Sequence, residues 1–193
     1  MSLFKKSELL SDLKASRQFN TEKSIFEDVK SFSSRKLIAD SKYFSEYKTY
    51  DIFLSHSYED EEIIYQLKIE LEKYGLTVYV DWIEDKQLDR SKVTKETAEI
   101  IRKRLKNCRS LVYAISPNSK LSSWVQWELG FADGHKNRKV AILPIDDDSN
   151  DSTFYKQEYL GLYPYIDKFA STIWVNGNRW TDIKSWLSGE KDV

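Results

Sequence analysis

A tryptophan and a glutamate four residues apart, Trp124 and Glu128, are the residues whose types and spacing most suggest chemistry in this sequence. On a helix, side chains four residues apart lie on the same face. An aromatic plane beside a carboxylate can hold a flat, cationic group that is linked to a ribose. The pair is also compatible with an ordinary helix surface, because most helix glutamates are solvated. The elements that position the pair must decide between these interpretations.

The composition predicts one packed domain with an appendage. The 193 residues are 40% hydrophobic and 14% aromatic. Lys and Arg number 30 against 31 Asp and Glu, so the net charge of −1 argues against nucleic acid or a membrane surface as a partner. No apolar run is long enough to span a bilayer, and the N-terminus turns polar too early for a secretory signal. A single cysteine excludes an internal disulfide, and we expect a cytoplasmic protein.

Residues 1–47 differ from the remainder of the chain. They are rich in Lys, Glu and Ser and contain no Gly, Pro or Trp. Two short apolar stripes, formed by Leu9, Leu10 and Leu13 and by Ile25, Phe26, Val29 and Phe32, predict short helices. We expect residues 1–47 to be a helical extension that docks on the main domain or on another chain, and residues 48–193 to form that domain.

From residue 48 onward, strand patterns alternate with helix patterns. We expect strands at residues 50–54, 76–80, 110–115, 140–143 and 172–175. We expect helices at about 59–74, 93–105 and 124–134, and a closing helix at 180–187. This alternation predicts an α/β fold of the flavodoxin-like type, with a five-stranded parallel sheet in the order 2-1-3-4-5 and helices on both faces.

In that strand order, ligands bind beyond the carboxyl ends of the first and third strands. The loop after the first strand contains Ser55, His56, Ser57 and Tyr58. The segment after the third strand leads into the helix that carries Trp124 and Glu128, and Asp81 and Trp82 open the loop after the second strand. The predicted fold therefore brings three segments, distant in sequence, to one crevice.

Several of these residues also have structural interpretations. His56 can act as a general base, but a strand-end histidine bonded to the backbone is the better interpretation. Ser55 and Ser57 can bind ribose or phosphate, although Ser57 with Asp60 also resembles a capping box. Asp81 can bind a ribose hydroxyl or simply begin a turn. For Trp124, a role in the pocket wall and a role as an anchor in the core are equally good interpretations.

Metal binding is not expected. The two histidines and the one cysteine are far apart in sequence, which argues against a structural zinc site. The acidic run at residues 146–148 lacks a spaced set of partner ligands, so a solvated loop is the better interpretation.

Three segments resemble Toll/interleukin-1 receptor (TIR) domains. Residues 50–57, Tyr-Asp-Ile-Phe-Leu-Ser-His-Ser, are similar to the first TIR box, and residues 124–128, Trp-Val-Gln-Trp-Glu, to the Trp-x-x-x-Glu motif of the members that consume NAD⁺. Residues 141–145, Ala-Ile-Leu-Pro-Ile, match a TIR strand that ends near a proline. The resemblance covers roughly residues 48–193 and is strongest to bacterial TIR proteins of Thoeris-type antiphage defence.

The resemblance implies an NAD⁺ glycohydrolase or cyclase, with NAD⁺ as substrate and no further cofactor. Glu128 matches the catalytic glutamate, and Ser55 to Tyr58, Asp81, Trp82 and Trp124 match segments that line the nucleotide pocket. Trp124 or Trp82 would stack on an aromatic ring of NAD⁺. The resemblance also implies self-association through TIR–TIR contacts and a separate effector activated by the nucleotide product.

One departure and two rival functions accompany this expectation. Acidic residues 59–62 stand where some animal members have basic ones, so phosphate binding there must use backbone N–H groups, hydroxyls or another chain. The rivals are a non-enzymatic TIR scaffold and an enzyme similar to nucleoside 2-deoxyribosyltransferases. A scaffold does not need the glutamate at position 128, so its presence favours an enzyme.

Overall fold

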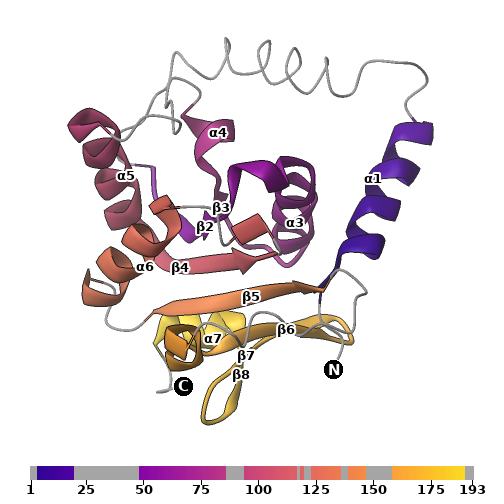
Figure 1. The fold of residues 1–193 in the computed structure, drawn as a ribbon. Helices are drawn as coiled ribbons and strands as arrows, with labels where there is room; N and C mark the ends of the chain where they lie inside the picture. Colours follow the sequence, from indigo (N-terminus) through magenta and orange to yellow (C-terminus); the bar gives the residue numbers. More distant parts are fainter. Residues whose placement is uncertain are drawn as a thin grey trace.

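The computed structural model shows a twisted sheet with helices on both sides (Figure 1). It describes residues 4–19, 48–85, 94–116, 118–119, 123–135, 139–146 and 158–189. The second predicted N-terminal helix, around residues 25–32, lies outside these ranges. Within the described parts, no helix is both long and apolar enough to cross a membrane.

The sheet confirms the predicted fold class. Its strands run in the order β3 (Val78–Tyr79), β2 (Tyr50–Ser55), β4 (Cys108–Ile115), β5 (Val140–Asp146), β6 (Tyr165–Phe169), β7 (Thr172–Asn176) and β8 (Trp180–Asp182). Strands β3, β2, β4, β5 and β6 pair in parallel. The first four predicted strands therefore occupy the order 2-1-3-4, and their connections cross over through helices.

The prediction for the fifth strand was wrong in detail. The fifth parallel strand is β6, whereas residues 172–175 lie in β7 and run antiparallel to it. Only Ala170 and Ser171 separate the two strands, and Ala170 has a φ of 54°. A connection this short can join antiparallel neighbours only, because parallel strands need a long crossover.

Two further boundaries differ from the sequence prediction. Residues 180–182, expected to start the closing helix, form β8 against β7, and helix α7 (Ile183–Ser188) begins after them. Strand β5 continues through Pro144 to Asp146, because the short strand β1 (Phe4–Lys5) pairs with Ile145 and Asp146. Distant pairing partners therefore set both boundaries.

The helices cover the sheet in two groups. Helices α1 (Lys6–Phe19), α3 (Glu61–Lys73) and α7 pack on one face, and α5 (Lys95–Asn107) and α6 (Ser123–His135) on the other. The strands supply both cores by alternation: Ile52 and Leu54 point to the first face, while Phe53 points to the second. Gly75, in the left-handed conformation with φ 74°, ends α3 as the sequence predicts.

The described N-terminal residues pack on the domain. Phe4 of β1 and Leu9 of α1 are buried in the first core, and α1 lies beside α3 (Figure 1). Docking on the main domain, one of the two predicted alternatives, is therefore what the structure shows for residues 4–19. The division of the chain at residue 47 stays a prediction.

Candidate active site

Three strand ends meet at one edge of the sheet. Because β3, β2 and β4 are neighbours and parallel, the residues that follow them lie side by side. The segment after β3 forms helix α4 (Asp81–Glu84), and the one after β2 contains the short helix η2 (Tyr58–Asp60). This is the switch point at which sheets of this type bind ligands.

A hydrogen bond with Ser55 links Glu128 to this edge of the sheet. The Ser55 hydroxyl donates a hydrogen bond of 2.6 Å to Glu128 Oε2, and both residues are 0% exposed. The structure therefore excludes the interpretation of Glu128 as a solvated helix residue. Helix α6 directs its carboxylate into the sheet edge, where the end of β2 orients it. Its catalytic role stays a prediction from the sequence.

His56 is a strand-end histidine whose two ring nitrogens are both engaged. Its Nδ1 lies 2.9 Å from the Leu54 carbonyl oxygen, and Trp82 Nε1 donates to its Nε2 at 3.1 Å. A carbonyl only accepts, so Nδ1 carries the hydrogen and Nε2 is the acceptor of a neutral ring. The geometry therefore favours the structural interpretation of His56 over the general base.

Asp81 and Trp82 begin α4 instead of an extended loop. The Asp81 carboxylate is buried, with Oδ1 3.8 Å from His56 Nε2. The Trp82 indole is half-buried against the first core, and its N–H is bonded to His56. Both residues thus lie at the predicted edge. Their contacts with NAD⁺ stay predictions.

Trp124 belongs to the core of the α6 face. It is 8% exposed and meets Trp127 edge to face, with ring centroids 5.7 Å apart. Trp127 in turn stacks on Phe131, four residues further along α6. The structure therefore supports the core-anchor interpretation of Trp124.

Ser57 and Tyr58 complete the predicted set. Ser57 is buried and precedes η2, but its side chain makes no capping bond, so the capping-box prediction was wrong. Asp60, the second residue of the predicted box, also makes no capping bond. Its carboxylate instead accepts a hydrogen bond from a different segment. The side chain of Tyr58 lies outside the described part of the structure.

A buried polar group that joins Asp60 to the turn after β4 was not predicted. Asp60 is 3% exposed, and its two carboxylate oxygens accept hydrogen bonds from the Ser116 hydroxyl and from Asn118 Nδ2, the latter at 2.8 Å. Ser119 Oγ accepts from the Ser116 backbone N–H at 2.8 Å. The signal in the sequence is a run of turn-forming polar residues directly after a buried strand.

Tyr113 of β4 has a raised pKa to which the charges of both Asp60 and Glu128 contribute. Burial raises the pKa of Tyr113 to about 12, a hydrogen bond with Ser119 opposes the shift, and the charges of Asp60 and Glu128 add to it. The phenol therefore stays protonated near neutral pH. Tyr113 also pairs in register with Ser55.

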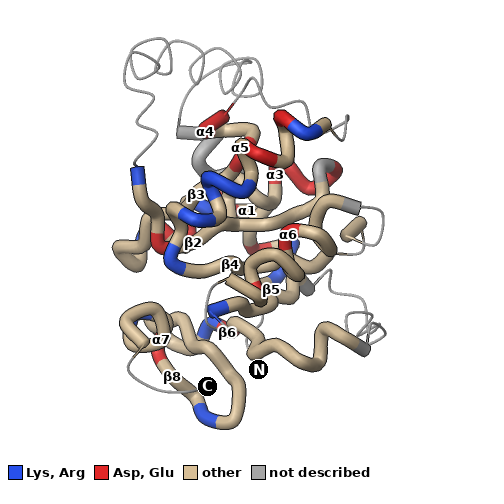
Figure 2. Tube along the Cα trace, turned by 90° about the vertical axis from the view of Figure 1, so that its left-hand side faces the viewer, with Lys and Arg blue, Asp and Glu red and all other residues tan. Residues whose placement is uncertain are grey.

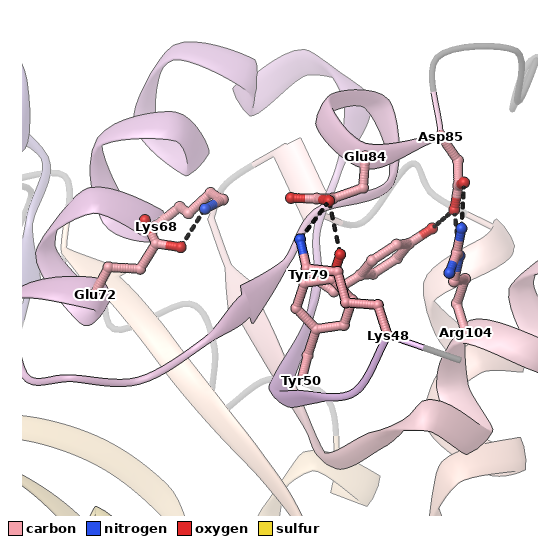
Figure 3. Close-up of polar contacts among 8 residues, drawn as sticks. All are labelled: Lys48, Tyr50, Lys68, Glu72, Tyr79, Glu84, Asp85 and Arg104. Carbon is pink, nitrogen blue, oxygen red and sulfur yellow. Dashed lines mark hydrogen bonds and ion pairs between the residues drawn. The ribbon is translucent and has the colours of Figure 1, made fainter. Parts of the chain in front are cut away.

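Helix α4 is fixed by an ion pair at its C-terminal end (Figure 3). Asp85 is 0% exposed and accepts from Arg104 Nε and Nη2 of α5 at 2.7 and 2.8 Å, and from the Tyr79 hydroxyl at 2.6 Å. The bond to Asp85 is the largest cause that raises the pKa of Arg104. One residue earlier, Glu84 accepts from the hydroxyl of Tyr50 at 2.6 Å.

Charges of both signs are interspersed along the described chain (Figure 2). Within the described ranges, no group of three or more His, Cys, Asp or Glu residues is placed to hold a metal ion. The acidic run at residues 146–148 falls mostly outside those ranges.

Comparison with known proteins identifies similar sequences. The family described as TIR domain matches residues 52–179. A protein of Bacillus cereus (strain MSX-D12), named "Probable 3' cyclic ADP-D-ribose synthase ThsB'", is 52% identical over 154 residues, which cover 76% of this chain and 79% of that protein. "Putative cyclic ADP-D-ribose synthase TIR2" of Cytobacillus dafuensis is 34% identical over 86 residues, which cover 44% of this chain and 23% of that protein.

Two solved structures show more distant similarity. The TIR domain of the Toll-related receptor TRR-2 from Hydra magnipapillata is 22% identical, with a TM-score of 0.40, and the match covers 56% of this chain and 80% of that one. The TIR domains of the activated Roq1 resistosome are 28% identical, also with a TM-score of 0.40, over 56% of this chain and 64% of that one.

Proposed function

Because the chain belongs to the TIR domain family, we propose that it is an NAD⁺-consuming enzyme that releases nicotinamide and forms a cyclic ADP-ribose. The relative that is 52% identical over three quarters of the chain bears the name of a 3' cyclic ADP-D-ribose synthase. The structural observation that carries the proposal is the buried Glu128 carboxylate at the switch point, oriented by Ser55.

In the proposed reaction, the bond between nicotinamide and the ribose C1′ breaks, and its electron pair leaves with the nicotinamide nitrogen. The ribose becomes cationic and resembles an oxocarbenium ion, which the negative Glu128 stabilises electrostatically. Its oxygens also accept hydrogen bonds from ribose hydroxyls, and these strengthen as charge develops. A hydroxyl oxygen of the same ADP-ribosyl group then attacks C1′ and loses its proton. Water in that place gives linear ADP-ribose.

The test is incubation of the purified chain with NAD⁺, followed by mass spectrometry of the products. We expect nicotinamide and an ADP-ribose that has lost one water relative to the linear form. Glu128→Gln keeps the shape of the side chain and removes its charge, so we expect nicotinamide release to fall by about 100-fold or more. Glu99→Gln, at an exposed glutamate of α5, is the matched control and should leave the rate unchanged.

The same assay separates the rival functions. A Glu128→Gln protein that melts like the wild type and releases nicotinamide at the same rate would contradict the assignment of Glu128. Base exchange on added deoxynucleosides, without nicotinamide release, would indicate a deoxyribosyltransferase. If neither reaction occurs, the scaffold is the remaining function.

The same proposal includes self-association and a separate effector. Both come from the resemblance to Thoeris-type TIR proteins. Size-exclusion chromatography with light scattering, with and without NAD⁺, tests the first. A chain that stays monomeric while it turns over NAD⁺ would contradict it. The location in the cytoplasm stays a prediction.

A further inference from the structure

We propose that Asp60 is a positioning residue for NAD⁺ cleavage, because its buried carboxylate ties the turn after β4 to the turn after β2 and so fixes how α6 presents Glu128. This inference rests on the proposed function. It concerns a residue that, in this proposal, does not touch the substrate.

Asp60 is buried, but its side chain does not cap helix α3, which begins directly after it. It stands at the position before α3, where an aspartate normally bonds the first backbone N–H groups, yet its side chain makes no capping bond. It is nevertheless 3% exposed. A carboxylate removed from water needs hydrogen bonds to compensate for lost hydration, so its partners in the other segment define its role.

Those partners lie in the turn after β4. Asp60 Oδ2 accepts from the Ser116 hydroxyl and Oδ1 accepts from Asn118 Nδ2 at 2.8 Å. Both oxygens are thus committed to residues that are 56 and 58 positions away in sequence. Both donors are neutral, so they hold the carboxylate in place by hydrogen bonds and not by an opposite charge.

The turn itself is built to transmit this constraint. The Ser116 backbone N–H donates to Ser119 Oγ at 2.8 Å, and the Asn118 N–H donates to Ser116 Oγ at 3.1 Å. Ser119 Oγ also reaches the Ala114 carbonyl at 3.3 Å, which anchors the turn on β4. Helix α6 begins at Ser123, four residues after this turn. In this proposal, the position of the turn that Asp60 holds restrains where α6 starts.

Two links consequently join the end of β2 to the β4–α6 segment. One is Asp60 with the turn at 116–119, and the other is the bond from Ser55 to Glu128. A helix held at one point can pivot, whereas two points fix its orientation. The charges of Asp60 and Glu128 both add to the raised pKa of Tyr113.

The test uses an exchange of the two partners in the full chain. Asp60→Asn leaves one side-chain acceptor oxygen where Ser116 and Asn118 both donate to the wild-type carboxylate, and Asn118→Asp sets two carboxylates against each other. We expect each single variant to lower kcat for nicotinamide release between about 10- and 100-fold with KM within about twofold, because a small misplacement of a catalytic group suffices for such a loss. The double variant Asp60→Asn/Asn118→Asp restores a carboxylate–amide pair and should return kcat to within about threefold of wild type.

Controls separate positioning from folding. Glu59→Gln, at the exposed acidic neighbour of Asp60, should leave kcat and melting temperature unchanged. Melting temperatures are measured for every variant. If the single variants fail to fold, Ser116→Ala is the milder test, because Asn118 still holds the carboxylate, and it should lower kcat by about threefold to tenfold.

The outcomes are distinguishable. A wild-type chain that releases no nicotinamide overturns the proposed function and this role with it. An active wild type beside a folded Asp60→Asn of equal kcat overturns the positioning role alone. So does a double variant that melts like the wild type but stays as slow as the single variants, or a loss that appears in KM and not in kcat.

Discussion

Asp85 and Glu128 are both completely buried near the carboxyl ends of neighbouring strands, but they are held by different donors. Asp85 accepts two hydrogen bonds from the Arg104 guanidinium, together with one from the Tyr79 hydroxyl. Glu128 accepts from the Ser55 hydroxyl. A guanidinium cancels the charge of its partner, whereas a hydroxyl orients a carboxylate through a neutral hydrogen bond.

This difference separates a structural carboxylate from one suited to catalysis. Once paired with Arg104, Asp85 has little field left to act on a ligand, and its role is to fix the end of α4 (Figure 3). A carboxylate that a hydroxyl orients in a place poor in water acts strongly on a developing cation. Asp60 is likewise held by neutral donors. Removal of these donors should therefore have different effects on the free energy of unfolding and on turnover for the two kinds of carboxylate.

The largest effect is expected at the ion pair. Arg104→Met leaves the Asp85 charge buried without its cation, and we expect a loss of about 3–5 kcal/mol in the free energy of unfolding, measured in urea. Asp85→Asn in the Arg104→Met background removes that charge and should recover part of the loss. A stable Arg104→Met protein would show that Asp85 is not structural and would contradict the distinction between Asp85 and Glu128.

The next effect is expected in turnover as well as in stability. Ser55→Ala removes a hydrogen bond to a charged group, which contributes about 1.5–3 kcal/mol, so kcat for nicotinamide release should fall about 10- to 100-fold. Ser55→Thr retains the hydroxyl and serves as the control. If Ser55→Ala lowers the unfolding free energy as much as Arg104→Met and leaves kcat intact, Ser55 and Glu128 form a structural pair.

A smaller effect is expected when the neutral donor to Asp85 is removed. Tyr79→Phe deletes the hydroxyl that lies 2.6 Å from Asp85 and leaves Arg104 in place. We expect a loss of about 1–2 kcal/mol in the free energy of unfolding, well below that of Arg104→Met. Equal losses for the two variants would mean that charge cancellation by Arg104 is not what holds Asp85.

The smallest effect is expected at the N-terminal cap of helix α7. Asp182 caps α7 by accepting from the backbone N–H groups of Lys184 and Ser185, each at 3.1 Å. Hydrogen bonds from Ser185 and Lys184 lower the pKa of Asp182. We expect Asp182→Ala to lower the unfolding free energy by about 1 kcal/mol near neutral pH.

The pH dependence of that loss has a defined sign. A lowered pKa in the folded state adds stability above the unfolded pKa, and this contribution disappears as the pH falls through the folded value. The difference between wild type and Asp182→Ala in urea should therefore shrink in acid. Asp182→Asn, which keeps an acceptor without a titrating group, is the control. A difference that is constant with pH would contradict the charged cap.

Much of the fold was predictable because local patterns agree with it. The apolar alternation around Phe53 and the glycine that ends α3 specify β2, α3 and the direction of the chain between them. The end of the sheet was not predictable in this way. Residues 172–175 form a strand as expected, but their antiparallel direction follows from the two-residue turn after β6, and β8 forms only because β7 offers a partner.

The candidate site, like the fold, was predictable only in part. The sequence indicated Glu128 by its spacing from Trp124 and by its resemblance to a known motif. It did not show that Trp124 packs in the core, that His56 uses both ring nitrogens, or that Asp60 leaves its helix for the turn after β4. Each of these depends on a partner from another element of the fold.

The sequence by itself determined the order of the strands from β2 to β5, the edge of the sheet where ligands are expected, and the residue types available there. Periodicity and turn residues act over a few positions, so the linear order records them. Only the tertiary structure decided which carboxylate meets a guanidinium and which meets hydroxyls. The partners of Asp85, Glu128 and Asp60 that decide this lie 19, 73 and 56 residues away, respectively, and no local pattern encodes such distances.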